Sequence, residues 1–319
     1  MCPNDLPWDP KDHYYSLNQY LQNQFGEKVY KIALDAGMTC PNRDGTVGFG
    51  GCLFCSAGGS GEFAEGHCGD IAQQIRRAKE RLSAKTKARR FIAYFQSYTN
   101  TYAPVSRLRQ IFEAAIAQPE VAALSIATRP DCLPEDVVEL LAELNQRKPV
   151  WVELGLQTIH EETAKNIRRG YALPVYEDAL TRLHRRGIQV IAHVILGLPG
   201  ETQEQMLETI DYLGNRGRPD GVKLQLLHIL KGTDLAQWYL DGRVKAMEMD
   251  EYFALLFRCI QRLPPDLVIH RLTGDGPKRL LIAPQWTGDK KRVLNEMRRQ
   301  MDLYGVVQGK HYKKAPDRG

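Results

Sequence analysis

The sequence of 319 residues has no long apolar run and no candidate leader segment. Residues 1–10 are polar and acidic, without the positive region and apolar stretch of a secretory signal. The longest apolar stretches carry charges or are shorter than a bilayer span; His193, for example, lies within the apolar stretch 190–198. We therefore expect a cytoplasmic protein that has no membrane partner.

The seven cysteines do not form the pattern of a disulfide framework. In a reducing compartment, closely spaced cysteines are more often metal ligands or redox groups. Cys2, Cys132 and Cys259 each stand alone, and we interpret them as packing or surface thiols. The other four fall within residues 40–68, so this segment is the candidate metal site.

Positive charge is concentrated in two segments. The chain has a net charge of +5, but residues 76–90 hold eight Lys or Arg and one Glu, and residues 290–319 hold nine Lys or Arg and three acids. The rest of the chain therefore carries a net charge of −8. Such a distribution favours a polyanionic partner, although a solvated helix face and a basic tail would give the same pattern.

Short β-branched runs alternate with helical patterns along most of the chain. Six such units in series indicate parallel strands with right-handed helical crossovers, in a doubly wound sheet or a partial (β/α) barrel. No GxGxxG follows the first strand, which disfavours a dinucleotide-binding sheet. In both architectures, functional residues should follow the carboxyl ends of the strands. The predicted strands are 29–34, 90–95, 123–127, 151–156, 189–196 and 221–229, and the predicted helices include 71–82, 106–117, 161–167, 175–185, 203–215 and 249–263.

The pattern changes after about residue 264. Two short strands are predicted at 267–272 and 280–283 around a Gly- and Pro-containing turn, followed by a helix over 290–303. We interpret this part as a small C-terminal extension that packs on the barrel. The predicted organisation is an N-terminal segment (1–27), the barrel (28–264) and a C-terminal extension with a basic tail (265–319).

A Gly-rich loop with three cysteines follows the first strand. Eleven residues, four of them Gly, separate Cys40 from the pair Cys52-Leu-Phe-Cys55. A CxxC pair can bind one metal ion or two corners of one cluster, and a Gly-rich loop allows a third thiolate to return to the same centre. Glycine also lets the backbone adopt positive φ beside a bulky inorganic core, and backbone N–H groups there can donate to cluster sulfides.

The number of thiolates distinguishes two kinds of metal site. Structural zinc and ferredoxin clusters normally use four protein ligands, whereas three cysteines leave one iron of a cluster open for another ligand. Cys68 is spaced so that it could complete a four-thiolate zinc site with Cys40, Cys52 and Cys55. The ligands alone leave both kinds of site open.

The cysteine loop and five later segments resemble the radical S-adenosylmethionine (SAM) superfamily. In the loop, an aromatic residue, Phe54, precedes the last cysteine. The later segments resemble the radical SAM domain of the elongator catalytic subunit and, more closely, the related small bacterial proteins of the YhcC/YtqA type, over roughly residues 28–285. They are Thr128-Arg-Pro-Asp131, Val152-Glu-Leu-Gly-Leu-Gln-Thr158, Ile167-Arg-Arg-Gly-Tyr171, His193-Val-Ile-Leu-Gly-Leu-Pro-Gly-Glu201 and Val222-Lys-Leu-Gln-Leu226.

This resemblance implies a partial (β/α)6 TIM-like barrel with a [4Fe–4S] cluster on Cys40, Cys52 and Cys55 and with SAM on the open iron. Gln157 resembles the ribose-binding residue of the superfamily. Gln96 stands, by position only, where the superfamily has a Gly-Gly-Glu motif that this sequence lacks. The expected SAM contacts are Phe54, Gln96, Thr128, Arg129, Glu153, Gln157, Arg169, His193 and Gly197, the last in a turn expected to pack under the adenine.

Simpler interpretations of several of these residues are also open. Arg129 could form a surface ion pair, Arg169 could be a charge at a helix C-terminus, and His193 could be a satisfied core residue. Glu153 and Gln157 share one face of a strand, which must point into the barrel if they are to reach a ligand. Burying Glu153 without a partner would cost several kcal/mol, so function or pairing is expected.

The resemblance also implies the chemistry and the partners. A reduced cluster cleaves SAM to a 5′-deoxyadenosyl radical that abstracts a hydrogen from the substrate, and an external donor such as flavodoxin or ferredoxin supplies the electron. Elongator relatives act on the wobble uridine of tRNA, and the bacterial relatives are linked to its position-5 side chain, such as a carboxymethylaminomethyl group. Without an acetyltransferase domain, acetyl transfer is not expected. We expect tRNA as the substrate, because the two basic segments and Trp286, Tyr304 and Tyr312 suit RNA.

Two alternatives stay open. A radical SAM enzyme that acts on a small molecule, like relatives of the coproporphyrinogen dehydrogenase type, would not show salt-sensitive tRNA binding. A non-enzymatic RNA-binding protein with zinc on four cysteines would be colourless, would contain no iron and would not need Gln157 or Arg169.

Overall fold

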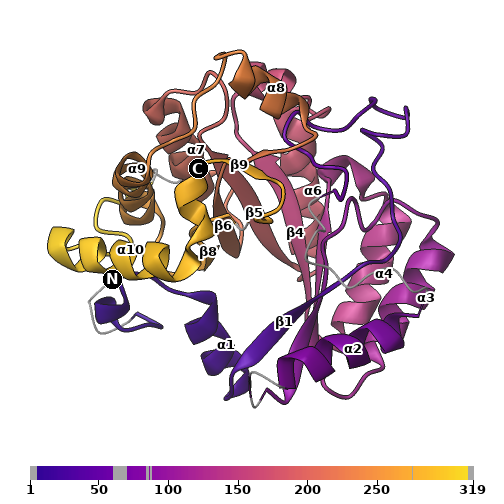
Figure 1. Ribbon diagram of the computed structural model, residues 1–319. Helices are drawn as coiled ribbons and strands as arrows, with labels where there is room; N and C mark the ends of the chain where they lie inside the picture. Colours follow the sequence, from indigo (N-terminus) through magenta and orange to yellow (C-terminus); the bar gives the residue numbers. More distant parts are fainter. Residues whose placement is uncertain (1–5, 60–69, 84–85, 87, 275, 315–319) are drawn as a thin grey trace.

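The computed structural model describes residues 6–59, 70–83, 86, 88–274 and 276–314. A parallel sheet of seven strands, in the order β1-β2-β3-β4-β5-β6-β8, lies at the centre and is curled into a half-barrel (Figure 1). Its strands are apolar almost throughout because both faces of the sheet are covered. The strands are β1 (Val29–Leu34), β2 (Arg90–Phe95), β3 (Val121–Thr128), β4 (Val150–Gln157), β5 (Gln189–Leu196), β6 (Gly221–Leu226) and β8 (Val268–Arg271).

Amphipathic helices pack around the curled sheet (Figure 1). They are α2 (Ile71–Ser83), α3 (Val105–Ile116), α4 (Glu135–Asn145), α5 (Glu161–Asn166), α6 (Leu173–Arg185), α7 (Gln203–Asn215) and α9 (Met249–Arg262). Helix α4, for example, buries Val137, Leu141 and Leu144 at helical spacing. Helix α7 begins at Thr202, which forms a capping box with Gln205. The helices cover the outside of the sheet, and the carboxyl ends of the strands are covered by loops, as the alternating pattern predicts.

The predicted partial barrel is confirmed, and its sheet has one strand more than the six predicted. Strand β8 comes from the segment that we assigned to the C-terminal extension, and it pairs in parallel with β6, where Val222 lies opposite Ile269. The unit α9–β8 thus repeats the preceding helix–strand pattern. Strand β9 (Leu281–Ala283) pairs instead with the short antiparallel strand β7 (Ile229–Leu230). The two strands predicted around the turn therefore belong to different sheets.

An unpredicted N-terminal helix, α1 (Leu17–Phe25), contacts both edge strands of the half-barrel, β1 and β8 (Figure 1). It begins at Ser16, which forms a capping box with Gln19. The backbone N–H of Ile269 donates to the carbonyl oxygen of Tyr15 at 2.8 Å. The first part of the chain therefore covers the open edge of β8, where unpaired backbone groups would otherwise be exposed.

Two further helices are α8 (Asp234–Leu240), which lies near the carboxyl ends of the strands, and α10 (Lys290–Tyr304), which is the last described helix of the chain. The unpredicted helix α8 is joined to the cysteine loop by a hydrogen bond from Leu235 N–H to the Leu53 oxygen. Helix α10 was predicted, and it packs through Val293, Met297 and Met301. Among the described helices, none is long and apolar enough to cross a lipid bilayer.

Replacement of Ile269 by Ala should lower the free energy of unfolding by about 2–5 kcal/mol, because it removes a buried side chain from the seventh strand. Chemical denaturation followed by circular dichroism would measure this loss. In the matched control Leu303→Ala, the removed side chain is 65% exposed on α10, and the change should stay below about 0.5 kcal/mol. Equal losses in the two variants would contradict the place of β8 in the core.

Candidate active site

A cavity of about 980 Å³ extends from the barrel interior to the carboxyl ends of the strands. All seven strands, or the loops after them, contribute to its wall. Eleven of the twelve predicted site residues line it: Cys40, Cys52, Phe54, Cys55, Gln96, Thr128, Arg129, Glu153, Gln157, Arg169 and His193. Most of this set lies at or just after the carboxyl ends of the strands, whereas Glu153 and His193 lie deeper, inside β4 and β5.

Gly197 is the predicted residue that does not line this cavity. It has a φ of +89° and borders, with the turn 198–200, a separate cavity of about 240 Å³. A Cβ atom at this position would lie 3.2 Å from the sulfur of Met247. The structure therefore places Gly197 in a tight left-handed turn, apart from the other predicted cofactor residues.

Three free, partly exposed thiols lie in the wall of the large cavity, on Cys40, Cys52 and Cys55. The loop that carries them folds back on itself because the N–H of Gly51 donates to the oxygen of Asn42 at 2.8 Å. Gly51 has a φ of +86°, a conformation that favours glycine. The glycines therefore serve the return of the loop, as predicted.

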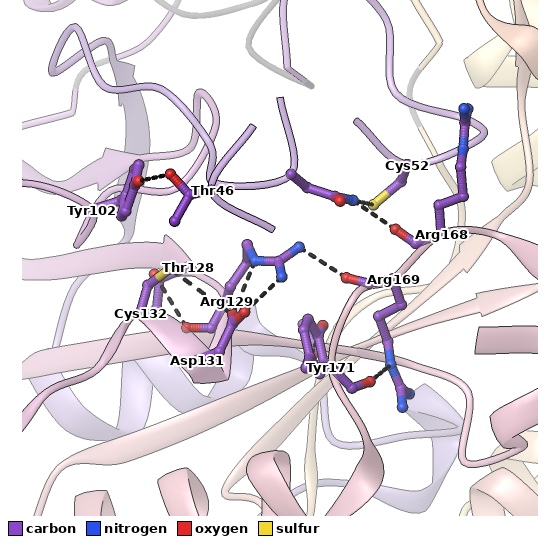
Figure 2. A network of polar contacts seen from close by, with 12 residues as sticks. Thr46, Cys52, Tyr102, Thr128, Arg129, Asp131, Cys132, Arg168, Arg169 and Tyr171 are labelled. Atoms are coloured by element: carbon purple, nitrogen blue, oxygen red, sulfur yellow. Dashed lines mark hydrogen bonds and ion pairs between the residues drawn. The ribbon is translucent and has the colours of Figure 1, made fainter. Parts of the chain in front are cut away.

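Two side chains that the sequence did not single out hold this loop in place. The amide of Asn42 donates to the Arg168 oxygen at 2.6 Å and to the Cys52 sulfur at 3.4 Å (Figure 2). The guanidinium group of Arg43 donates to the backbone oxygens of Cys55, at 3.2 Å, and Ser56. Their only signal in the sequence was a polar pair just after Cys40-Pro41.

The surroundings of Cys52 favour its thiolate form. The hydrogen bond from the Cys55 thiol, partly opposed by burial and assisted by the charge of Arg129, lowers the pKa of Cys52 to about 7. The same contact and burial raise the pKa of Cys55. Because the thiolate is the form that binds metals, this wall of the cavity suits a metal cluster.

Cys68, the possible fourth ligand of the zinc alternative, lies outside the described residues. In the described parts of the chain, no group of three or more His, Cys, Asp or Glu side chains forms a ready-made site for a metal ion. The fit to a cluster therefore rests on the shared cavity wall and on the chemistry of the three thiols.

Arg129 is buried, 8% exposed, and is not a surface ion pair. Its guanidinium group binds both carboxylate oxygens of Asp131, at 2.9 and 2.7 Å, and donates to the Arg169 oxygen at 2.9 Å (Figure 2). It also lies 4.9 Å from the centre of the Tyr171 ring. Arg129 thus links the end of β3 to the loop that follows α5.

Arg169 is only 1% exposed and binds backbone rather than solvent. Its guanidinium group donates to the carbonyl oxygens of Leu156, Thr158 and Tyr171, at 3.0, 2.6 and 2.9 Å. A residue at an exposed helix C-terminus would not be held in this way. Arg169 therefore ties the end of β4 to the loop 167–171, whatever contact it also makes with a ligand.

Gln157 ends β4 in a strained conformation. A β-bulge lies between Gly155 and Gln157, and Gln157 has a φ of +60°, which costs a non-glycine residue about 1–3 kcal/mol. The Tyr171 hydroxyl donates to the Gln157 side-chain oxygen at 3.0 Å and to the Gly155 oxygen at 3.0 Å. Glu153, Gly155 and Gln157 all line the cavity, so they face the interior as the strand pattern predicts.

Glu153 is buried deep in the barrel and is fully paired. One carboxylate oxygen accepts from Lys31 at 2.6 Å and from Ser125 at 2.7 Å. The other accepts from His193 at 2.8 Å and from Lys223. Burial alone would raise the pKa of Glu153, but the two lysines hold it well below its usual range.

His193 and Lys223 complete this buried group. Burial lowers the pKa of His193 to about 4, so its ring is neutral at neutral pH and donates to Glu153. Lys31 and Lys223 were not predicted as site residues. The available signal was a lysine inside each of two otherwise apolar strands, β1 and β6.

The sequence matches the radical SAM superfamily over residues 40–213, from the first cysteine of the loop to helix α7. The chain belongs to the radical SAM superfamily. Residues 219–302 match the radical SAM C-terminal domain. Membership implies a [4Fe–4S] cluster and SAM, and it favours a three-cysteine cluster over a four-cysteine zinc site.

Two bacterial relatives align along nearly the whole chain. YtqA of Bacillus subtilis (strain 168) is 45% identical over 318 residues, which are 99% of this chain and 98% of the relative. YhcC of Escherichia coli (strain K12) is 37% identical over 287 residues, which are 90% of this chain and 91% of the relative. The predicted relation to the YhcC/YtqA type is confirmed.

The relation to elongator is partial and distant. Elongator complex protein 3 of Schizosaccharomyces pombe is 28% identical over 179 residues, which are 55% of this chain and 32% of the relative. A solved structure of Elp3 from the archaeon Methanocaldococcus infernus has a TM-score of 0.67 at 18% identity and covers 88% of this chain and 64% of that one. This second likeness shows a shared fold.

The variant Arg169→Met should weaken SAM binding about tenfold or more and lower the melting temperature, because three carbonyl groups near Gln157 lose their donors. Equilibrium dialysis with reconstituted protein and thermal denaturation would measure the two effects. Arg258→Met, which removes an exposed ion pair to Glu204 on the outer helices, is the control. Unchanged SAM binding in Arg169→Met would show that this arginine does not support the cofactor site.

Proposed function

We propose that this radical SAM enzyme modifies the position-5 side chain of the wobble uridine of tRNA. In this proposal Cys40, Cys52 and Cys55 hold a [4Fe–4S] cluster, and SAM lies beside it against the ends of β2 to β5. When bound, the reduced cluster and SAM supply the radical that abstracts a hydrogen atom from the substrate. Radical SAM enzymes need an external electron donor, here a flavodoxin or a ferredoxin.

The residues of the chain hold and shield the reacting groups in this proposal. Asn42 and Arg43 shape the cysteine loop. Arg129 and Arg169 fix the loops at the ends of β3 and β4, and Tyr171 orients the side chain of Gln157. The barrel encloses the cavity, which limits the access of water to a reactive radical.

The charge of the cavity wall carries the proposal of a nucleic-acid substrate. The described lining residues include nine lysines and arginines and one acidic residue, Glu153. The basic ones are Lys31, Arg43, Arg81, Arg129, Arg169, Lys223, Arg271, Lys278 and Lys290. A cavity so rich in positive charge attracts anionic ligands, of which RNA is the one that the relation to elongator favours.

The basic helix α10 extends this positive surface. Lys290 lies at its start and lines the cavity, and the residues Lys291, Arg292, Arg298 and Arg299 are exposed along the helix. This arrangement supports the expected binding of a folded RNA, because phosphate contacts dominate such affinities.

The three aromatic residues expected to stack on RNA have different positions. Trp286 packs against Tyr252 and donates to the Met247 oxygen at 3.0 Å, and Tyr312 donates to the Gly214 oxygen at 2.9 Å. Both are held by the protein. Tyr304 is 63% exposed at the end of α10 and is the one of the three open to a base.

Mass spectrometry of tRNA nucleosides tests the proposal. Cells that lack the gene should accumulate one position-5 derivative of the wobble uridine, and the wild-type gene should restore the normal profile. An unchanged nucleoside profile in the deletion strain would remove the tRNA substrate but not the radical SAM assignment.

The variant Cys52→Ala should fail to restore that profile, because one cluster ligand is missing. The purified variant should lose its iron and its SAM cleavage but keep its secondary structure and cooperative unfolding. Cys259→Ala, which removes a buried thiol on α9 far from the loop, is the matched control and should keep iron and activity. Global unfolding of Cys52→Ala would indicate a structural metal instead.

Charge reversal of Lys291, Arg292 and Arg299 to Glu should weaken tRNA binding and reduce its dependence on salt, because phosphate contacts are lost. Fluorescence anisotropy at several salt concentrations would measure this. SAM cleavage without tRNA should be unchanged. Reversal of Arg185 and Arg186, at the end of α6, is the control. Equal losses of tRNA binding in both variants would contradict a specific role of α10.

A further inference from the structure

The deepest part of the large cavity is a buried polar group centred on Glu153, which was expected to contact SAM and whose carboxylate accepts four hydrogen bonds from side chains of the protein. We call it the barrel floor and define it by Lys31, Tyr94, Glu153, Lys223 and His270, which all line the cavity. Glu153 precedes Gln157 by four residues on β4, so the floor lies roughly 13 Å below the strand end. It lies on the strands rather than on loops, and its geometry is therefore rigid.

Positive charge exceeds negative charge at the barrel floor. Lys31 and Lys223 share the single carboxylate of Glu153. Burial, with the nearby charges of Lys31 and Arg271, lowers the pKa of Lys223 well below its usual range. A bound anion would oppose this shift and stabilise the ammonium form of Lys223. His193 and His270 do not add charge, because burial lowers the pKa of both rings.

The floor also has unused hydrogen-bond donors. The two ammonium groups have six N–H groups, and within the described residues they make three hydrogen bonds: Lys31 to Glu153, and Lys223 to Glu153 and to the Tyr94 hydroxyl. Glu153 accepts from four donors, so its lone pairs are filled. Nδ1 of His270 is buried and has no hydrogen-bond partner in the described parts of the chain.

We propose that the barrel floor is an anion-binding subsite in which the ammonium groups of Lys31 and Lys223 bind a carboxylate at the end of the substrate. One negative charge balances the two lysines and Glu153. This inference rests on the proposed function and deepens it, because it makes the group carried by the modified side chain anionic. Lys31 and Lys223 are then the residues that determine specificity.

The subsite discriminates by charge. A neutral ester or amide carbonyl can accept hydrogen bonds from the ammonium groups but carries no negative charge, so it leaves the excess positive charge of the floor uncompensated. Sites of this kind reject analogues that lack the matching polar group more strongly than apolar pockets reject a missing methylene. Glu153 has the separate task of neutralising one of the two lysine charges.

Two pairs of probes test the subsite on the reconstituted enzyme with SAM bound, by calorimetry under anaerobic conditions. The first pair is 5-carboxymethyluridine and its methyl ester, and the second is propionate and propionamide, which contain no uridine. The wild-type enzyme should bind the carboxylate of each pair about tenfold or more tightly than its neutral partner. In Lys223→Met this preference should disappear, while the affinity for SAM should not change.

Matched variants separate charge from folding. Lys79→Met removes a lysine that pairs with Glu120 at 3.0 Å on the outer surface, and it should keep the full preference. Lys223→Met combined with Glu153→Gln removes one charge of each sign, so that no buried carboxylate loses a partner, and it should still lose the preference. Glu153→Gln alone should keep or increase carboxylate binding, because it makes the floor more positive.

The outcomes distinguish this inference from the proposed function. If the enzyme prefers propionate to propionamide but does not prefer 5-carboxymethyluridine to its methyl ester, the result would support the subsite and contradict uridine as the substrate. A loss of SAM affinity in Lys223→Met equal to the loss of carboxylate binding would show that the floor holds the carboxylate of SAM, and would overturn the inference. Equal binding of acid and neutral partner in both pairs would also overturn it.

Discussion

One buried carboxylate connects most of the half-barrel. Glu153 on β4 accepts from Lys31 on β1, Ser125 on β3, His193 on β5 and Lys223 on β6. A buried charge is tolerated only when it is paired, and removing one partner costs several kcal/mol. The curled sheet therefore has its lowest energy in the register that brings these donors together. The loops that carry the thiols and the arginines are built on strands held in that register.

Much of the architecture could be predicted from local patterns. The apolar runs and their turns predicted the strands from β1 to β6, and the resemblance to the superfamily singled out eleven residues that line one cavity. The seventh strand was assigned to the extension because its four residues, Val268–Arg271, are too few to distinguish from a short hairpin strand. Its parallel pairing with β6 brings Val222 opposite Ile269, and no local pattern contains a pairing between segments that α8 and α9 separate.

Site residues could be predicted where the residue type itself restricts the chemistry. They were harder to predict where the role of a residue depends on a partner far away in the sequence. The spacing of the cysteines indicates a metal site by itself, and the resemblance to the radical SAM superfamily selects a cluster. The pairing of Lys31 with Glu153 joins residues 122 positions apart, and only the fold shows it. Arg169 shows the opposite case. A resemblance assigns it to SAM, whereas in the structure it donates to three backbone carbonyl oxygens and to the carboxylate of Glu161. The sequence is compatible with both roles, the contact with SAM and the binding of the protein's own backbone.

The contact between Tyr15 and Ile269 joins the two ends of the fold across more than 250 positions of sequence. During synthesis, the segment before α1 has no edge to cover until β8 has left the ribosome. Contacts between segments so far apart in the sequence are slow to form. The edge strand and the segment that protects it from pairing with another chain therefore meet only when synthesis of the chain is nearly complete.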